Sequence, residues 1–355
     1  MRWHPITMTY HVRSYRFGER LIPDMLGKRG VPDGIVAETW EISDHAETTA
    51  TITNGPFAGK TLRDLVTSHP EGLVGEGWEG DRFPILDKFL DASHMLPVHL
   101  HADDATARRK YGEPNGKDEA WHILHCEPGA TILAGIIPGT PPGAIADAFR
   151  REDYDAVMPR YAIEAGDTVY VPGGVIHSFG PDTLIFEVQQ TSDLAVSVMP
   201  ADLYGNRLDE ATWEANIAAA MDELRTDFLP RPHHGLTRWI ETNRYVVCCA
   251  GPHFALERWN LVKPHREPAR PDRCLTLTNL GDPVGIAWDG GVETLDRATS
   301  CVIPAAMGAF SLVPDGRAVL LACYVPDIER DIVAPLREAG YSRDQIAGLG
   351  ETASR

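Results

Sequence analysis

The sequence has 355 residues, of which 43% are hydrophobic, and its formal net charge is −18. This length and apolar content suit two domains, or one large domain with appendages. A protein that binds duplex nucleic acid needs basic surface to neutralise phosphates, so the acidic balance argues against nucleic acid and against anionic membrane surfaces as partners. No apolar run is long enough to span a bilayer, and the N-terminus lacks the apolar stretch of a signal peptide.

The six cysteines are scattered through apolar runs, and none forms a C-x-x-C pair. Such spacing is typical of free, buried thiols and not of a disulfide scaffold. We therefore expect a cytoplasmic protein.

The first half of the chain alternates strand patterns with two helical segments. Short apolar runs bounded by Gly and Pro predict strands, and Thr61 and Thr140 are expected to cap a short helix and a helical insertion, respectively. The expected strands cover residues 35–42, 48–55, 119–136, 161–180 and 183–193, and the helical segments cover 59–73 and 140–158. Closely spaced strands with turn residues between them favour a β-sandwich or barrel.

The second half begins with the clearest helix of the chain, at residues 208–229, which are rich in Ala, Glu and Leu. A strand-rich segment and short helices follow it. The sequence thus predicts four parts: a first β domain, a helical linker, a second β domain and a helical tail. Their expected ranges are 1–205, 206–236, 237–326 and 327–355.

Two histidines stand one residue apart in the stretch VHLHADD, residues 98–104. Alternate side chains of a strand point to the same face, so His99 and His101 share a face and can both reach one metal ion. An H-x-H pair alone is weak evidence, because lone histidines are often ordinary core or surface residues.

A second motif strengthens the metal hypothesis. Gly166, Pro172, Gly174 and His177 stand in a G-x5-P-x-G-x2-H spacing, in which a turn delivers the histidine to the start of a strand. Together with the H-x-H pair, this spacing resembles the two motifs of the cupin superfamily of jelly-roll barrels.

The cupin resemblance implies a metal held by His99, His101, a glutamate and His177. Glu119 opens the next apolar run and is the better candidate, whereas Glu113 lies in a turn-rich loop. Three nitrogens and one carboxylate suit Zn²⁺ as the first expectation, and Mn²⁺, Fe²⁺, Co²⁺ or Ni²⁺ as alternatives.

A closer resemblance is carried by seven segments that occur in the same order as in the type I mannose-6-phosphate isomerase family. They are ETWEISDH (38–45), NGPFAGKTLRDL (54–65), RFPILDKFLDA (82–92), HLHADD (99–104), GKDEAWHIL (116–124), GDTVYVPGGVIHSFG (166–180) and IFEVQQTSD (185–193). The segment HFALERWNL (253–261) looks like the start of the family's C-terminal domain. The resemblance implies two cupin-like jelly-roll barrels joined by a helical linker, an all-β fold with helical insertions. The second barrel lacks metal ligands.

The same resemblance implies metal-dependent aldose–ketose isomerisation through an enediol(ate), with a sugar or sugar phosphate as the partner. A general base must move the proton between C1 and C2. The candidates are Glu187, Lys117 and Asp193, and Gln189 is expected to share the barrel interior with Glu187. An ion pair that merely holds the barrel together is the alternative for each charged residue.

Three positions depart from the family's pattern. The family has a glutamine at His99, a serine at Pro97 and an arginine at Ser197, and the last two would serve the substrate phosphate. Arg207 is the expected substitute for that arginine if its loop turns inward, while residues 108–110 are more simply a solvated basic face. We therefore expect an altered phosphate subsite and a non-phosphorylated or differently decorated sugar.

Two other functions stay open. His99 completes a three-histidine, one-glutamate set that would also suit a cupin dioxygenase binding Fe²⁺ and O₂. A sugar-binding protein that has lost catalysis is the third possibility. The sequence leaves the oligomeric state open.

Overall fold

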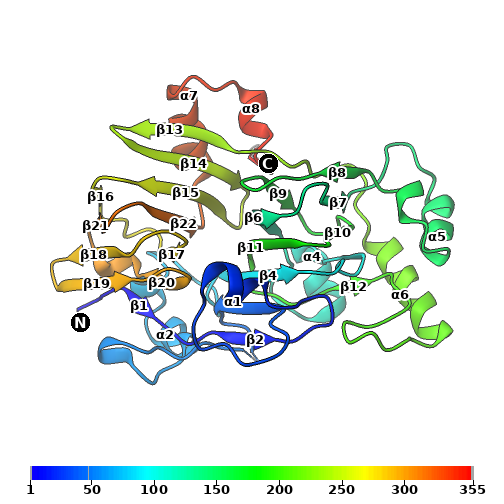
Figure 1. Cartoon of the computed structure of the whole chain (residues 1–355), viewed down its shortest axis with the longest axis horizontal. Coiled ribbons are helices and arrows are strands. Elements are labelled where there is room, and N and C mark those ends of the chain that lie inside the picture. The colour runs from blue at the N-terminus through cyan, green and yellow to red at the C-terminus, as the bar shows by residue number, and fades with distance from the viewer. Residues whose placement is uncertain (1, 47, 353–355) are drawn as a thin grey trace.

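In this computed structural model, residues 2–46 and 48–352 are described, and their strands form four antiparallel sheets. Two sheets build a barrel from the first half of the chain, and two build a barrel from the second half (Figure 1). This is the predicted cupin-like fold with helical insertions. None of the helices in the described residues is long and apolar enough to cross a membrane.

The first barrel pairs a six-stranded with a five-stranded sheet. The six-stranded order is β2 (His11–Arg13), β3 (Glu38–Ile42), β4 (Ile85–Ala92), β11 (Thr183–Gln190), β6 (Glu119–Cys126) and β9 (Thr168–Val171). The five-stranded order is β12 (Val196–Ser197), β5 (His99–Leu100), β10 (His177–Phe179), β7 (Thr131–Ala134) and β8 (Arg160–Ala162). Leu90 and Ile185 of one sheet pack in the same core cluster as Ile132 and Phe179 of the other. The inner faces of the two sheets therefore enclose a common core.

The second barrel pairs a seven-stranded with a four-stranded sheet. The larger order is β1 (Ile6–Thr7), β20 (Thr299–Ile303), β17 (Leu275–Asn279), β22 (Ala318–Tyr324), β15 (Ala255–Leu261), β14 (Asn243–Ala250) and β13 (Leu236–Ile240). The smaller order is β16 (His265–Glu267), β21 (Phe310–Pro314), β18 (Val284–Trp288) and β19 (Gly291–Leu295). The N-terminal strand β1 thus joins the sheet of the second barrel, a pairing that the expected boundaries did not include. The division at residues 205 and 236 stays a prediction.

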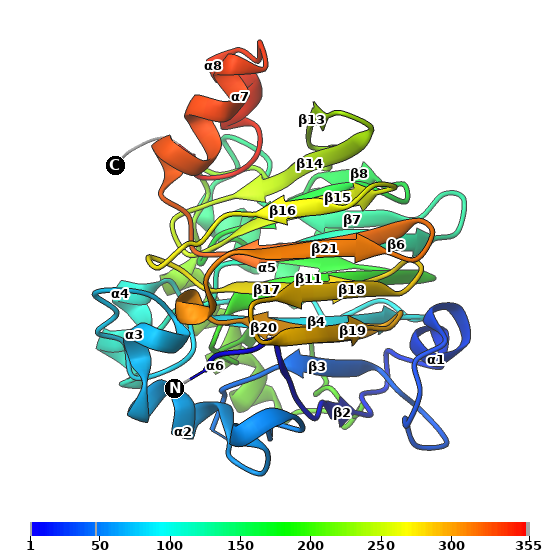
Figure 2. The ribbon, with the colours of Figure 1, turned by 90° about the vertical axis from the view of Figure 1, so that its left-hand side faces the viewer.

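Helices lie at the ends and edges of the barrels, with α5 and α6 together at one end and α7 and α8 at another edge (Figures 1 and 2). The α-helices are α1 (Leu21–Leu26), α2 (Leu62–Ser68), α3 (Pro70–Leu73), α4 (Asp104–Thr106), α5 (Pro142–Arg150), α6 (Glu210–Glu223), α7 (Ala334–Glu338) and α8 (Arg343–Ala347). Shorter or wider helical turns are η1 (Gly55–Phe57), η2 (Ala107–Tyr111), η3 (Tyr154–Ala156), η4 (Ala305–Met307) and η5 (Ile328–Val333).

Most local predictions agree with these elements. The predicted cap Thr61 is confirmed, because its hydroxyl accepts from the N–H of Asp64 and the Asp64 carboxylate accepts from the N–H of Thr61. The predicted cap Thr140 is wrong. Helix α5 follows Pro141, and the Thr140 hydroxyl instead donates to the carbonyl of Ile137, since the two prolines that follow it have no N–H to be capped.

Two further expectations concern the strand at residues 48–55 and the free cysteines. Residues 48–55 form only isolated bridges, because Thr51 pairs with Thr61 while Ile52 pairs with Met8, so no ladder extends. All six cysteines are free, and five of them are buried, with Cys126 half-buried.

The two barrels are joined by a large apolar core. Strand β4 contributes Ile85 and Phe89 to it, and strands of the second barrel contribute Leu256 and Leu321. Asp87, between these two β4 residues, is fully buried, and no atom of the described residues hydrogen-bonds its carboxylate within ordinary limits. Burial raises the pKa of Asp87 to about 7, although the nearby Thr276 and Cys323 act in the opposite direction.

We expect Asp87→Asn to stabilise the protein at neutral pH. The folded-state pKa of Asp87 lies above its ordinary value of 3.8, so the folded state keeps a proton that the unfolded state loses. The free energy of unfolding of the wild type should therefore fall, relative to that of the variant, as the pH rises from about 4 to about 7. The size of this fall is roughly 1.4 kcal/mol for each unit by which the folded and unfolded pKa values differ, and above about pH 7 the difference between the two proteins should stay constant. Urea unfolding at pH 5, 6, 7 and 8 measures it. Asp289→Asn, at an exposed position, is the control, and a pH-independent difference would contradict the assignment.

Candidate metal centre

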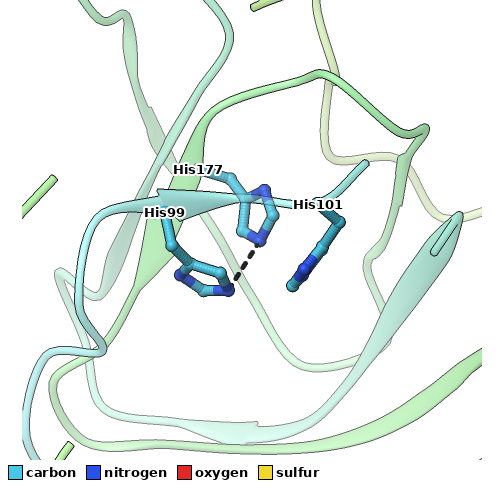
Figure 3. A group of neighbouring side chains, drawn as sticks. All are labelled: His99, His101 and His177. Atoms are coloured by element: carbon cyan, nitrogen blue, oxygen red, sulfur yellow. Dashed lines mark hydrogen bonds between the residues drawn. The ribbon is translucent and has the colours of Figure 1, made fainter. Parts of the chain in front are cut away.

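Three histidine rings face one another inside the first barrel (Figure 3). His99 and His177 open the neighbouring strands β5 and β10 and are directly paired across the ladder, while His101 lies one residue beyond β5. Their ring centroids are 4.3 to 4.9 Å apart, and the Nε2 atoms of His99 and His177 are 3.2 Å apart. The H-x-H pair and the histidine of the Gly/Pro turn thus come together.

Backbone contacts fix which nitrogen of each ring is protonated. The Nδ1 atoms of His99, His101 and His177 lie 2.7 to 2.8 Å from the carbonyl oxygens of Pro97, Leu194 and Val175, respectively. A carbonyl oxygen only accepts, so each Nδ1 carries the hydrogen and each neutral ring presents an Nε2 lone pair to the centre.

Burial keeps the first two rings neutral. It lowers the pKa of His101 to about 4 and the pKa of His99 well below its ordinary value, with neighbouring positive groups adding to the effect. The imidazoles are therefore set up as electron-pair donors and not as cations.

Glu119 supplies the carboxylate from the opposite sheet, as the first residue of β6. Its Oε2 lies 3.0 Å from His101 Nε2, and its Oε1 lies 3.2 Å from His177 Nε2. The Trp121 indole donates to Oε1 at 2.8 Å and fixes the carboxylate. Burial raises the pKa of Glu119, but Lys117 and the histidines outweigh it, so the pKa lies well below its ordinary value.

This donor set fits a divalent cation. Lone pairs of three histidine nitrogens converge beside a carboxylate, and the Lys117 ammonium, 3.0 Å from His101 Nε2 and 2.8 Å from Glu119 Oε2, is the positive group that already lies against them. Such nitrogen and oxygen donors hold Zn²⁺ and its first-row neighbours, and the carbonyls that accept from the Nδ1–H groups fix the orientation of the rings, as at known metal sites. His99, His101, His177 and Glu119 would hold the ion. The alternative ligand Glu113 pairs instead with Arg82 at 2.9 Å.

A line of buried charges runs from the centre across the six-stranded sheet. Lys117 Nζ lies 2.8 Å from Glu119 Oε2 and 3.7 Å from Glu187 Oε1, which itself lies 3.1 Å from Lys88 Nζ. Lys88 Nζ is 3.9 Å from Glu38 Oε2. Burial and the Glu119 charge raise the pKa of Glu187, and the two lysines oppose this. Burial lowers the pKa of Lys88, but Glu187 and Glu38 outweigh it and raise the pKa overall.

A cavity of about 580 Å³ opens beside this line of charges. Buried charged residues line it together with apolar residues and two exposed acids, Asp193 and Asp202, and no arginine lines it among the described residues. Its lining is Tyr15, Phe17, Glu38, Lys88, Leu90, Leu96, Pro97, His99, His101, Tyr111, Lys117, Glu119, Phe179, Glu187, Asp193, Ala195, Val196, Ser197, Ala201, Asp202, Leu203, Leu208, Asn216 and Ala219.

The predicted site residues divide into two groups. Glu187, Lys117 and the exposed Asp193 line the cavity, and Ser197 lines it too, paired across the ladder with His99. The structure does not bring the other two residues to the lining. Gln189 is buried and donates its amide N–H groups to the carbonyls of Gln190 and Ser192, and Arg207 is exposed.

Sequence reasoning missed Lys88 and Glu38. Both are charged residues within buried strands, where every position of β3 and β4 is buried. The signal was present, because charges inside a continuous apolar run such as ILDKFLDA are seldom buried unless they are paired. Lys88 pairs with Glu38 and with Glu187, and Glu187 comes from a strand about 100 positions further along the chain, which the local pattern does not reveal.

The two barrels, with three histidines and a glutamate gathered inside the first, define a cupin-type protein whose donor set can hold a metal. Residues 13–124 match the model of the phosphomannose isomerase type I catalytic domain. The relatives described next are similar to this chain over most of its length, and their names are those of mannose-6-phosphate isomerases.

Two relatives come from Bacillus subtilis strain 168. The "Probable mannose-6-phosphate isomerase GmuF" is 28% identical over 310 residues, 87% of this chain and 96% of the relative. Mannose-6-phosphate isomerase ManA is 29% identical over 234 residues, 65% of this chain and 72% of the relative. A crystal structure of the mannose 6-phosphate isomerase from Bacillus subtilis superposes with a TM-score of 0.81 at 25% identity, covering 90% of this chain and 99% of that one.

We expect the purified protein to bind one divalent metal, and His101→Ala or His177→Ala to lose it. Removing one converging donor should lower affinity strongly, and chelation of the wild type should lower its melting temperature because the metal binds the folded state. Metal analysis and thermal unfolding with and without chelator measure both effects. His125→Ala, on the same strand as Glu119 but outside the cluster, should behave like wild type. Equal metal content in all three variants would exclude this centre.

Trp121→Phe should weaken metal binding while leaving the ligands in place. The substitution removes the 2.8 Å indole bond to Glu119 but keeps an aromatic ring in the core. Loss of such an orienting contact lowers metal affinity by about 10- to 100-fold. Competition with a chromophoric chelator measures the affinity. Trp213→Phe, which removes an indole bond to the carbonyl of Val198 near α6, is the control and should not change it.

Proposed function

We propose that this protein is a metal-dependent aldose–ketose isomerase whose catalytic part is residues 1–205. The match to the phosphomannose isomerase type I catalytic domain and the similarity to named isomerases support the reaction class, and the cavity beside the donor set supports the location. Its volume of about 580 Å³ lies within the usual range for small-molecule sites, about 300 to 1,000 Å³. The single observation that carries the proposal is that two histidines of the donor set, His99 and His101, line this cavity together with Glu119, Lys117 and Glu187.

Isomerisation of an aldose moves one proton from C2 to C1 and another between the two oxygens. A divalent ion held by the donor set would polarise these oxygens and offset the negative charge of an enediol(ate). Lys117 and Glu187 are the residues we assign to carrying the proton, because both line the cavity and lie 3.7 Å apart. Asp193 is the third candidate, at the exposed edge of the cavity.

The surrounding side chains support these roles. Lys88 holds Glu187 at 3.1 Å and is itself buried, so the carboxylate is fixed in position. Phe17, Leu90 and Phe179 also line the cavity, and apolar side chains strengthen the electrostatic interactions of the charged groups near them.

The charges at the cavity favour an uncharged sugar. Lys88 and Lys117 are the cations in the lining, and both are already paired with carboxylates, while Asp193 and Asp202 stand nearer the mouth. The positions that carry phosphate-binding serine and arginine in the family pattern are Pro97 and Ser197 here. A phosphate dianion would find no free guanidinium and would be repelled by these acids. The relatives' names include a phosphorylated sugar, so this chain's substrate differs from theirs in charge.

The first functional test is isomerisation of free mannose against mannose 6-phosphate. The protein is loaded separately with Zn²⁺, Mn²⁺, Co²⁺ and Fe²⁺ and followed by proton NMR in D₂O, which reports ketose formation and deuterium at C2. We expect turnover of mannose and little turnover of its phosphate. Faster turnover of the phosphate would refute the altered subsite. Oxygen uptake by the Fe²⁺ form without isomerisation would refute the isomerase and favour the dioxygenase that the third histidine allows.

Variants of the proton carriers should separate catalysis from metal binding. Glu187→Gln and Lys117→Met should each lower kcat by about 10²- to 10⁴-fold, the usual contribution of general acid–base catalysis. Metal analysis of the same preparations shows whether the metal is kept, as we expect for Glu187→Gln. Glu79→Gln makes the same carboxylate-to-amide change at an exposed position, and this control variant should keep full activity. Wild-type rates in both variants would leave Asp193 as the remaining candidate.

A further inference from the structure

A second cavity, of about 340 Å³, lies inside the C-terminal barrel. It is lined from both sheets of that barrel, by residues of β13 to β17, β20, β21 and β22, and by residues of η5 and α7 at one edge. The strands of this half face the viewer in Figure 2. No residue of its lining belongs to the lining of the first cavity. A ligand here would therefore bind without competing for the metal centre.

The floor of the second cavity is a fixed hydrogen-bonded network. Glu257, which is buried, accepts from the Trp259 indole at 2.8 Å and from the Tyr324 hydroxyl at 2.6 Å. His265 bridges Tyr245 at 2.7 Å and Glu267 at 3.0 Å. These polar side chains satisfy one another, so they form a rigid wall and leave other groups to meet a ligand.

The remaining charge is positive. Five arginines line the cavity against three carboxylates, those of Glu257, Glu267 and Asp331, although the whole chain carries −18. The arginines are Arg238, Arg266, Arg270, Arg273 and Arg330. An excess of guanidinium groups in so acidic a chain makes this cavity a local site for anions.

Two of the arginines keep unused donors. The Nε atoms of Arg238 and Arg270 are buried, and no atom of the described residues accepts a hydrogen bond from either of them. Their nearest carboxylate contacts are 3.7 Å, from Arg238 to Glu257 and from Arg270 to Glu267. Arg330, in contrast, is committed to Asp331. Buried N–H groups without acceptors are costly, and an oxyanion would satisfy them with charge-assisted bonds.

The size and walls of the cavity define the rest of the ligand. Tyr245, Trp259 and Phe310 provide aromatic surface, and about 340 Å³ is at the small end of ligand sites. We propose that the C-terminal barrel binds a small anionic ligand of about sugar size, a phosphate monoester or a carboxylate, through Arg238 and Arg270. This inference does not depend on the proposed isomerase activity.

Binding is tested on the full-length, metal-loaded protein by isothermal titration calorimetry. The probes are inorganic phosphate, mannose 6-phosphate, gluconate and neutral mannose, and the experiment is repeated with His177→Ala to remove the first site. We expect at least one anionic probe to bind equally well to wild type and His177→Ala. Preference for mannose 6-phosphate or for gluconate separates the phosphate ester from the carboxylate.

Arginine variants locate that binding. Arg238→Gln and Arg270→Gln should each weaken it at least tenfold, Arg238→Lys should weaken it less, and exposed Arg317→Gln should leave it unchanged. Circular dichroism and melting temperatures confirm that each variant folds. No binding of any anionic probe at millimolar concentration, loss of binding in His177→Ala, or undiminished binding in both glutamine variants would each overturn the proposal.

Discussion

The structure of the centre depends on three hydrogen bonds from imidazole Nδ1–H groups to backbone carbonyls. Each bond fixes a tautomer, and together they turn three Nε2 lone pairs towards one another and towards Glu119. The carbonyl acceptors belong to Pro97, Val175 and Leu194, each two residues before a strand of the five-stranded sheet, so the backbone that leads into this sheet sets the chemistry of the side chains. Converging donors in a buried site favour a cation, and the fold therefore arranges a donor set that can hold a metal.

The line of charges beside the centre connects metal binding to substrate choice. Lys117 and Lys88 are held between Glu119, Glu187 and Glu38, and each lysine is therefore committed to carboxylates. Buried pairs of this kind are costly to form and costly to break, since removing one partner leaves an uncompensated charge. In the proposed function, the same network would hold the proton carriers in place and leave its lysines paired with carboxylates, without a free charge for a phosphate.

The two barrels contain the same local hydrogen bond in different surroundings. Glu119 and Trp121 on β6, and Glu257 and Trp259 on β15, form the same carboxylate–indole bond between residues two positions apart on a strand, at 2.8 Å in both barrels. In the first barrel, histidines from the facing sheet complete a metal site. In the second barrel, arginines surround the carboxylate, and the cavity becomes suited to an anion. The ligand that each barrel interior suits therefore depends on the few side chains that surround its carboxylate–indole pair.

The sequence by itself determined the elements whose signals are local. The H-x-H pair, the Gly/Pro turn before His177 and the cap at Thr61 depend on short-range geometry, and the structure contains each of them. The long helix predicted at 208–229 is also present, over the shorter range Glu210–Glu223. The alternation of strand residues was enough to place His99 and His101 on one face. The resemblance to a known family supplied the two-barrel fold.

Only the tertiary structure decided what lies across a sheet or between barrels. Lys88 meets Glu187 because β4 and β11 are neighbours, β1 joins a sheet built almost 300 residues later, and Arg207 stays outside the cavity because its loop is exposed. The second cavity and the burial of Asp87 also result from packing between strands that are distant in the sequence. Pairings between distant strands depend on which faces are buried together, and a local pattern of polar and apolar residues does not specify the partner.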